Sequence, residues 1–283
     1  MKRKVLLATL TLAVCSQAYA DIIVNTGGPT NGIAMASRPD STGKTEIETA
    51  DDFTVSTGAG EFVDSGTFTG LLQGTVTQPT VQNVIIEIYR VFPLDSTQPP
   101  SGNVVTRANS PSDNALDSFD AAAAQLSFST AVLASSFTAL NSVQAGGINP
   151  KPGQTTGGNG AVSGQETQFN FTLTTPLFLP DGHYFFVPQV QVSGGEFLWL
   201  SGDRPLTGPD VGPTPDLQAW TRDAALDPDW SRVGTDIVGG ATPPTFNGAF
   251  SLDGTPVPEP STFGLAFTAL GLTAWRVTKR RRA

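Results

Sequence analysis

The sequence predicts an all-β protein, a β-sandwich of jelly-roll-like type with long Gly/Pro-rich loops and one short helix. Short runs with strand character recur through the middle of the chain, and most of them are bounded by turn residues. The 283 residues include 30 Gly and 22 Pro, which favour many turns over long helices. Many short strands separated by such turns are typical of two packed sheets.

The first half of the chain contains three of these runs. The segment 52–55 is a short apolar run that ends at a Ser-Thr-Gly turn. In 65–72, Phe68 alternates with Thr67 and Thr69, as in a half-buried strand. The segment 83–92 is almost continuously apolar and β-branched, which indicates a strand that is buried on both faces.

The second half of the chain adds further strands. Phe169, Phe171 and Leu173 alternate with polar residues, which again predicts a half-buried strand. The runs 183–192 and 196–200 flank a Ser-Gly-Gly turn and predict a β-hairpin. The segment 249–252 is expected to be the last strand, so the sandwich is predicted to span residues 21–252.

The predicted helix and loops lie between these strands. The helix is expected over 112–125, because Ser112 or Asp113 suits an N-cap and the centre is rich in Ala. Three segments rich in Gly, Pro, Ser, Thr and Asn are expected to be loops, namely 26–48, 145–164 and 201–216.

The charge of the chain is distributed very unevenly. Between Asp21 and Pro258 there are eight basic and 24 acidic residues, a formal charge of −16. Binding to nucleic acid requires clustered cations for the phosphates, so this region is not expected to bind nucleic acid. The other eight basic residues lie in the two terminal segments.

The N-terminal segment has the organisation of a signal peptide, predicted to cover residues 1–20. Lys2, Arg3 and Lys4 precede the apolar run 5–14, and Ala18 and Ala20 fit the small-x-small rule for cleavage before Asp21. Cys15 is the only cysteine, so a chain cleaved at this site contains neither a disulfide nor a cysteine nucleophile.

The C-terminal segment combines three features in a fixed order. A Pro-rich linker is predicted over 253–260 and ends in Val257, Pro258, Glu259 and Pro260. A short apolar transmembrane helix is predicted over 261–278. Residues 279–283 form a basic tail, which the positive-inside rule places in the cytoplasm. The basic residues that anchor this end are Arg276, Lys279, Arg280, Arg281 and Arg282.

These three features resemble the PEP-CTERM sorting domain, over about the last 27 residues only. The resemblance implies that Val257 to Pro260 are the sorting motif and that an exosortase-like membrane enzyme processes the tail. It also implies an exported protein of the envelope or extracellular matrix, anchored transiently in the membrane, in a Gram-negative bacterium that makes exopolysaccharide. It implies nothing about the fold or activity of the ectodomain.

Few residues of the ectodomain suggest chemistry. His183 is the only histidine, follows a Pro-Asp-Gly turn and is expected to be structural. A glycoside hydrolase needs two carboxylates across a cleft, and Glu87 and Glu196 are candidates from strand-like runs. Trp220 and Trp230 are candidates for stacking on sugar rings, against the alternative of packing under a loop.

No cofactor is expected, although several acidic residues carry the oxygen ligands that calcium prefers. Their spacing matches no EF-hand loop, and roles in turns and caps are the alternative. These residues are Asp51, Asp52, Asp113, Asp117, Asp120, Asp227, Asp229 and Asp236.

The sequence therefore predicts a non-enzymatic envelope or matrix protein with a structural or interaction role linked to exopolysaccharide. The alternatives are a carbohydrate-binding module and a secreted glycoside hydrolase.

Overall fold

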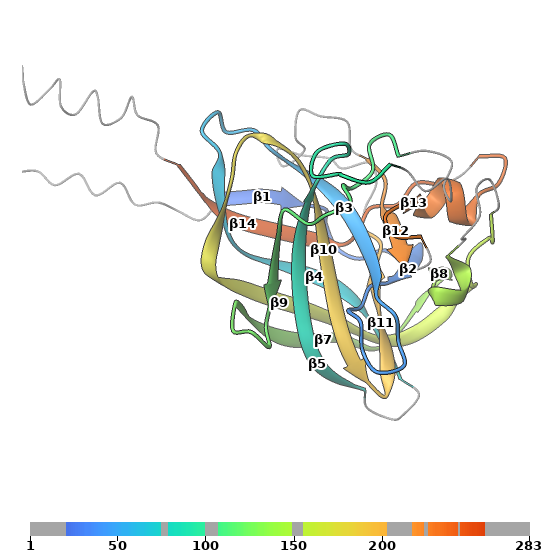
Figure 1. Cartoon of the computed structure of the whole chain (residues 1–283). Coiled ribbons are helices and arrows are strands. Elements are labelled where there is room, and N and C mark those ends of the chain that lie inside the picture. Colours follow the sequence, from blue (N-terminus) through green and yellow to red (C-terminus); the bar gives the residue numbers. More distant parts are fainter. Residues whose placement is uncertain are drawn as a thin grey trace, which may run out of the picture.

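The structure is a computed structural model that describes residues 21–74, 79–99, 107–148, 155–202, 217–223, 226–242 and 244–257. Two sheets pack face to face, and helical structure is confined to a single 3₁₀ turn and a single π-helical turn within the described residues (Figure 1). The prediction of an all-β sandwich is confirmed.

The larger sheet, called the large sheet below, has eight strands. One path through it runs β1-β14-β4-β11-β2-β8, and β4 also pairs with β9, which in turn pairs with β7. The bounds are β1 Asp21–Asn25, β14 Phe250–Pro256, β4 Glu61–Gly74, β11 Gly195–Leu200, β2 Ile33–Ala36, β8 Asn141–Val143, β9 Val162–Leu179 and β7 Leu126–Ala139.

The smaller sheet, called the small sheet, has six strands in the order β13-β12-β3-β10-β5-β6. Every pair in it is antiparallel. The bounds are β13 Ser231–Arg232, β12 Trp220–Asp223, β3 Ile47–Val55, β10 Gly182–Ser193, β5 Thr80–Arg90 and β6 Asp117–Asp120.

Aromatic side chains fill the space between the sheets. Phe186 of the small sheet stacks on Phe250 of the large sheet at 4.9 Å and meets Trp199 edge-on at 6.0 Å. Phe68 and Phe169 stack within the large sheet at 4.8 Å. Each of these rings buries on the order of 150–250 Å² of surface, so they dominate the hydrophobic free energy of the fold.

The alternation predicted for 169–173 is present in β9. Phe169, Phe171 and Leu173 are buried in the core, whereas the side chains between them lie on the other face of the sheet. The same alternation puts Phe68 of β4 in the core and Thr67 on the outer face. This regular alternation creates the polar outer face described below.

The predicted hairpin is wrong in its pairing, although both strands exist. β10 pairs with β3 and β5 in the small sheet, and β11 pairs with β4 and β2 in the large sheet. The chain therefore changes sheet at Ser193–Gly195, where Gly194 has a positive φ of 70°. Hydrophobic burial in two different layers overrides the local turn signal.

The predicted helix over 112–125 is also wrong. This segment contains β6, with Phe119 packed into the core, followed by a turn at residues 121–124. The Asp120 carboxylate accepts a hydrogen bond from the Ala122 N–H at 2.8 Å, and Ala124 has a positive φ of 58°. Pairing of β6 with β5 outweighs the helix propensity of alanine, which is only a weak preference. The only 3₁₀ turn of the described residues is instead Ala145–Gly147, and the π-helical turn is η2, Val233–Val238.

The predicted loops and linker contain more structure than expected. The segment 26–48 includes β2 and the start of β3, and 145–164 includes the start of β9. The linker predicted from residue 253 is in fact a strand as far as Pro256, because β14 is hydrogen-bonded between β1 and β4. The sandwich therefore ends four residues later than predicted.

Candidate functional site

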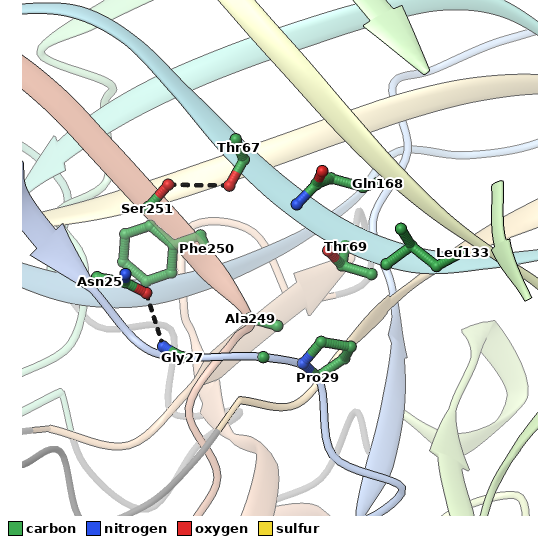
Figure 2. Close-up of a pocket in the computed structure, with 11 residues that line it drawn as sticks. Asn25, Gly27, Pro29, Thr67, Thr69, Leu133, Gln168, Ala249, Phe250 and Ser251 are labelled. Atoms are coloured by element: carbon green, nitrogen blue, oxygen red, sulfur yellow. Dashed lines mark hydrogen bonds between the residues drawn. The ribbon is translucent and has the colours of Figure 1, made fainter. Parts of the chain in front are cut away.

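A pocket of about 330 Å³ lies on the outer face of the large sheet (Figure 2). Strands β4, β7, β9 and β14 contribute to it, and the loop that follows β1 forms one wall. The lining residues are Asn25, Gly27, Gly28, Pro29, Thr67, Thr69, Leu133, Gln168, Ala249, Phe250 and Ser251.

Strand register brings the polar side chains of the floor together. Thr67 of β4 lies opposite Ser251 of β14, and their hydroxyl groups are 2.9 Å apart. Thr69 lies opposite Gln168 of β9. Residues two apart on a strand share a face, so Thr67 and Thr69 of β4 point to the same side of the sheet. The four side chains therefore form two neighbouring cross-strand pairs, one between β4 and β14 and one between β4 and β9.

The wall is fixed by Thr26, which is buried next to β14. Its hydroxyl donates to the Gly248 carbonyl at 2.7 Å and accepts from the Phe250 N–H at 2.8 Å. Gly27 then turns the chain with a positive φ of 79°, and the Asn25 side chain accepts its N–H at 2.9 Å. The wall therefore has a defined position above the floor.

The pocket is uncharged, although the chain between residues 21 and 258 is strongly acidic. Among the described residues that line it there is no carboxylate, imidazole, amine or guanidinium. Gln168 is half-buried, and its side-chain amide makes no hydrogen bond within the described residues. Leu133 and Pro29 add apolar surface (Figure 2). Neutral donors and acceptors beside apolar surface can bind a neutral polyhydroxyl molecule, but they supply no general acid or base.

A second polar cluster lies on the outer face of the small sheet and is closed to solvent. Arg222 of β12 donates to Glu48 of β3 through Nε, and to the Tyr89 hydroxyl at 3.2 Å. The Tyr89 hydroxyl also donates to Glu48. The Arg222 guanidinium lies 4.5 Å from the centre of the Trp230 ring. Since Glu48, Tyr89 and Arg222 are all buried, this cluster ties three strands together.

Glu87 of β5 lies beside this cluster. Burial, followed by the negative charge of Glu48, raises the pKa of the Glu87 carboxyl to about 8. The Tyr89 hydroxyl lies 3.3 Å from the Glu87 carboxyl. Two neighbouring carboxyl groups are a pattern of glycoside hydrolases, but here Glu48 is inside the protein, where no sugar can reach it.

Both tryptophans considered as candidates for sugar stacking are in the interior, which agrees with the alternative of packing under a loop. Trp220 is 2% exposed and Trp230 is fully buried. Trp230 also donates its indole N–H to the Ser112 carbonyl at 3.0 Å. Stacking on a sugar requires an exposed ring face, and loops over the small sheet cover both rings.

The two carboxylates proposed for a hydrolase are not brought together. Glu87 belongs to the small sheet, whereas Glu196 of β11 belongs to the large sheet and pairs with Arg38 at 2.8 Å. His183 is bonded through Nε2 to Asp52 at 2.6 Å, and Asp52 also accepts the Leu217 N–H at 3.0 Å. This arrangement agrees with a structural role for His183.

The acidic residues considered for calcium have protein partners. Asp113 and Asp229 both contact Arg107, at 2.7 and 3.3 Å, and Asp236 is bonded to Arg232. Across the described parts of the chain, no three His, Cys, Asp or Glu side chains are grouped so that they could hold a metal ion.

The predicted sorting residues lie almost entirely outside the described residues. Val257 is the last residue described, and Pro258, Glu259, Pro260 and the basic residues from Arg276 to Arg282 follow it. Ala18 and Ala20 precede the first described residue. Neither helical turn in the described part of the chain has the length and apolar character needed to cross a membrane.

Comparison of the chain with protein-family profiles, with curated proteins and with solved structures gives no match. The pocket was not predictable from the sequence, because its lining comes from five segments that meet only in the fold. The sequence feature that could have indicated the pocket is the alternation of Thr, Ser, Asn and Gln residues in β4, β9 and β14.

Proposed function

We propose that this protein is exported and displayed at the cell envelope by a C-terminal PEP-CTERM-like sorting signal. The observation that supports this is the pairing of β1 with β14. Asp21, predicted to be the first residue after cleavage, lies opposite Gly254, two residues before the end of β14. Both terminal segments therefore join the sandwich at the same edge of the large sheet. This arrangement is compatible with a domain that is anchored through its C-terminal segment.

The second part of the proposal is that the displayed sandwich binds a neutral carbohydrate in the pocket of Figure 2. An uncharged site on an acidic protein favours a neutral ligand over a polyanion, because desolvating an unpaired charge is costly. The amides and hydroxyls of Gln168, Thr67 and Thr69 match the alternating donors and acceptors of sugar hydroxyls. Because sorting signals of this kind accompany exopolysaccharide production, we propose the neutral exopolysaccharide of the same cells as the source.

In this proposal, the pocket lies close to the end of the domain that would face the membrane. Ser251 and Pro256 are separated by five residues of β14, which is about 16 Å at about 3.3 Å per residue. A polymer bound there would lie near the cell surface. The proposed role is thus attachment of secreted polysaccharide to the envelope, without catalysis.

The test is affinity electrophoresis of the purified full chain in gels that contain polysaccharide. Neutral exopolysaccharide from the producing cells should slow the protein, whereas the polyanion alginate should not. The variant Q168L removes a half-buried amide at similar volume and should weaken binding roughly tenfold, which is the effect of one or two hydrogen bonds. The matched control is T172V, on the same strand but outside the pocket. Retardation by alginate alone, or equal loss in both variants, would refute the carbohydrate site.

A further inference from the structure

The long strand β7 forms an edge of the large sheet that lacks the usual protection. Among the described strands β7 pairs only with β9, so its other side presents backbone N–H and C=O groups to solvent (Figure 1). The middle of the strand is exposed, including Val132 at 57% and Leu133 at 50%. Such an edge is a template for pairing with another strand.

The composition of β7 makes this exposure unusual. Its fourteen residues include no charged residue and no proline. The other edge strands are five residues long or shorter, and three of them carry charge. These are β1 with Asp21, β6 with Asp117 and Asp120, and β13 with Arg232, while β8 has only three residues. Short length and charge are the common devices against edge pairing, and only β7 lacks both.

The regular part of β7 is complementary to itself. Its pairing with β9 is uninterrupted from Leu126 to Val132, before the first bulge. Antiparallel pairing of two copies about Ser129 sets Leu126 against Val132 and Phe128 against Thr130 on one face. On the other face it sets Ser127 against Ala131 and Ser129 against itself. On one face the contacts are then mainly between apolar side chains and on the other between small side chains, and no charge is buried.

Charge also favours a second copy at this strand. Two chains that each carry −16 between Asp21 and Pro258 repel one another, and this repulsion is smallest where both present neutral residues. The segment 126–132 is such a neutral strip.

We propose that two copies of this protein associate through antiparallel pairing of β7 with β7, centred on Ser129. The two large sheets become one continuous sheet, and the two-fold axis keeps their outer faces on the same side. Both pockets then open on one surface. Association strengthens as salt screens the acidic repulsion.

The first test is register-specific cross-linking of the full chain in a Cys15→Ser background, which removes the only native cysteine. Under mild oxidation S129C should form a covalent dimer, because each Ser129 faces its own copy. S127C alone should remain monomeric, whereas a mixture of S127C and A131C should cross-link. Equal cross-linking of S129C and S127C alone, or none in S129C, would overturn the proposed register.

The second test measures the mass of the full chain in detergent by light scattering. The variant S129K places a charge opposite its own copy and should reduce the dimer at least tenfold. The matched control is T172K, on the adjacent strand β9 and opposite Ser127, which leaves the free edge unchanged. Unchanged thermal unfolding of both variants establishes that they fold. A dimer that persists in S129K, or is lost equally in T172K, would contradict pairing through β7.

Discussion

Glu48 and Arg222 form an ion pair between β3 and β12, and only 5% and 8% of their side-chain surfaces are exposed. Arg222 also contacts the hydroxyl of Tyr89 and the ring of Trp230. Removal of the cation leaves the buried Glu48 carboxylate without an opposite charge, although it still accepts from the Tyr89 hydroxyl. We therefore expect Arg222→Met to lower the free energy of unfolding by about 3 kcal/mol, measured by urea denaturation.

The control for this prediction is the ion pair of Arg90 with Asp95, whose side chains are about one third exposed. Solvent screens this pair, so Arg90→Met should change stability by less than about 1 kcal/mol. Equal effects of the two substitutions would show that burial does not determine the contribution of Arg222.

A second prediction concerns pH and Glu87. Burial and the neighbouring Glu48 raise the pKa of Glu87 from its ordinary 4.5 to about 8. Between these values the folded state binds more protons than the unfolded state, so stability falls as pH rises from about 4.5 to 8. Glu87→Gln removes this contribution and should stabilise the protein at pH 8 by on the order of 4 kcal/mol relative to pH 4.5. Urea denaturation at the two pH values measures this difference, and identical pH slopes in both proteins would contradict it.

How far the sequence predicts the fold depends on how local the signal is. The alternation around Phe169 and Phe171 is local, and both its strand character and its buried face are correct. The Ala-rich segment after Asp120 locally favours a helix, and the turn at Gly194 locally favours a hairpin. Both predictions fail, because β6 pairs with β5 and β11 pairs with β4, strands that are distant in the sequence. Pairing between strands that are far apart in the sequence cannot be recognised from a segment of about ten residues.

The candidate site was less predictable than the fold. Trp220 and Trp230 have the right chemistry for sugar stacking, yet only the three-dimensional packing shows that both are covered. Conversely, Thr67, Gln168 and Ser251 are ordinary strand residues in the sequence, and only strand register brings them together. Residue type alone therefore did not identify the residues of the candidate site.

A third prediction concerns the end of the sandwich. Residues 253–256 of β14 all pair with β4, and Asp253 and Gly254 also pair with β1, so that Gly254 lies opposite both Asp21 and Val63. A chain that ends at Val257 should keep the thermal unfolding midpoint of the full chain. A chain that ends at Leu252 loses both sets of ladder hydrogen bonds, and its midpoint should fall by roughly 10 °C or more. Equal midpoints would show that the last four residues of β14 add nothing.

The last prediction concerns sorting, which the proposed function requires. Glu259 stands between two prolines, and proline restricts the backbone. We therefore expect Pro258-Glu259-Pro260 to lose little conformational entropy when the proposed processing enzyme binds it. Because β14 ends at Pro256, this motif follows the folded domain directly. We expect Pro258→Ala with Glu259→Ala to leave membrane insertion intact but to block processing, so that full-length protein accumulates in the membrane.

Replacing Arg280, Arg281 and Arg282 by Gln should have a different effect, because we propose that these charges keep the C-terminus in the cytoplasm and take no part in recognition by the processing enzyme. Uncleaved protein should then leave the membrane fraction. Cell fractionation with mass measurement of the C-terminus separates the two results. Normal C-terminal processing of the Pro258/Glu259 double variant would refute the sorting signal. The proposals of a carbohydrate site and of pairing through β7 are tested by separate experiments and do not depend on this result.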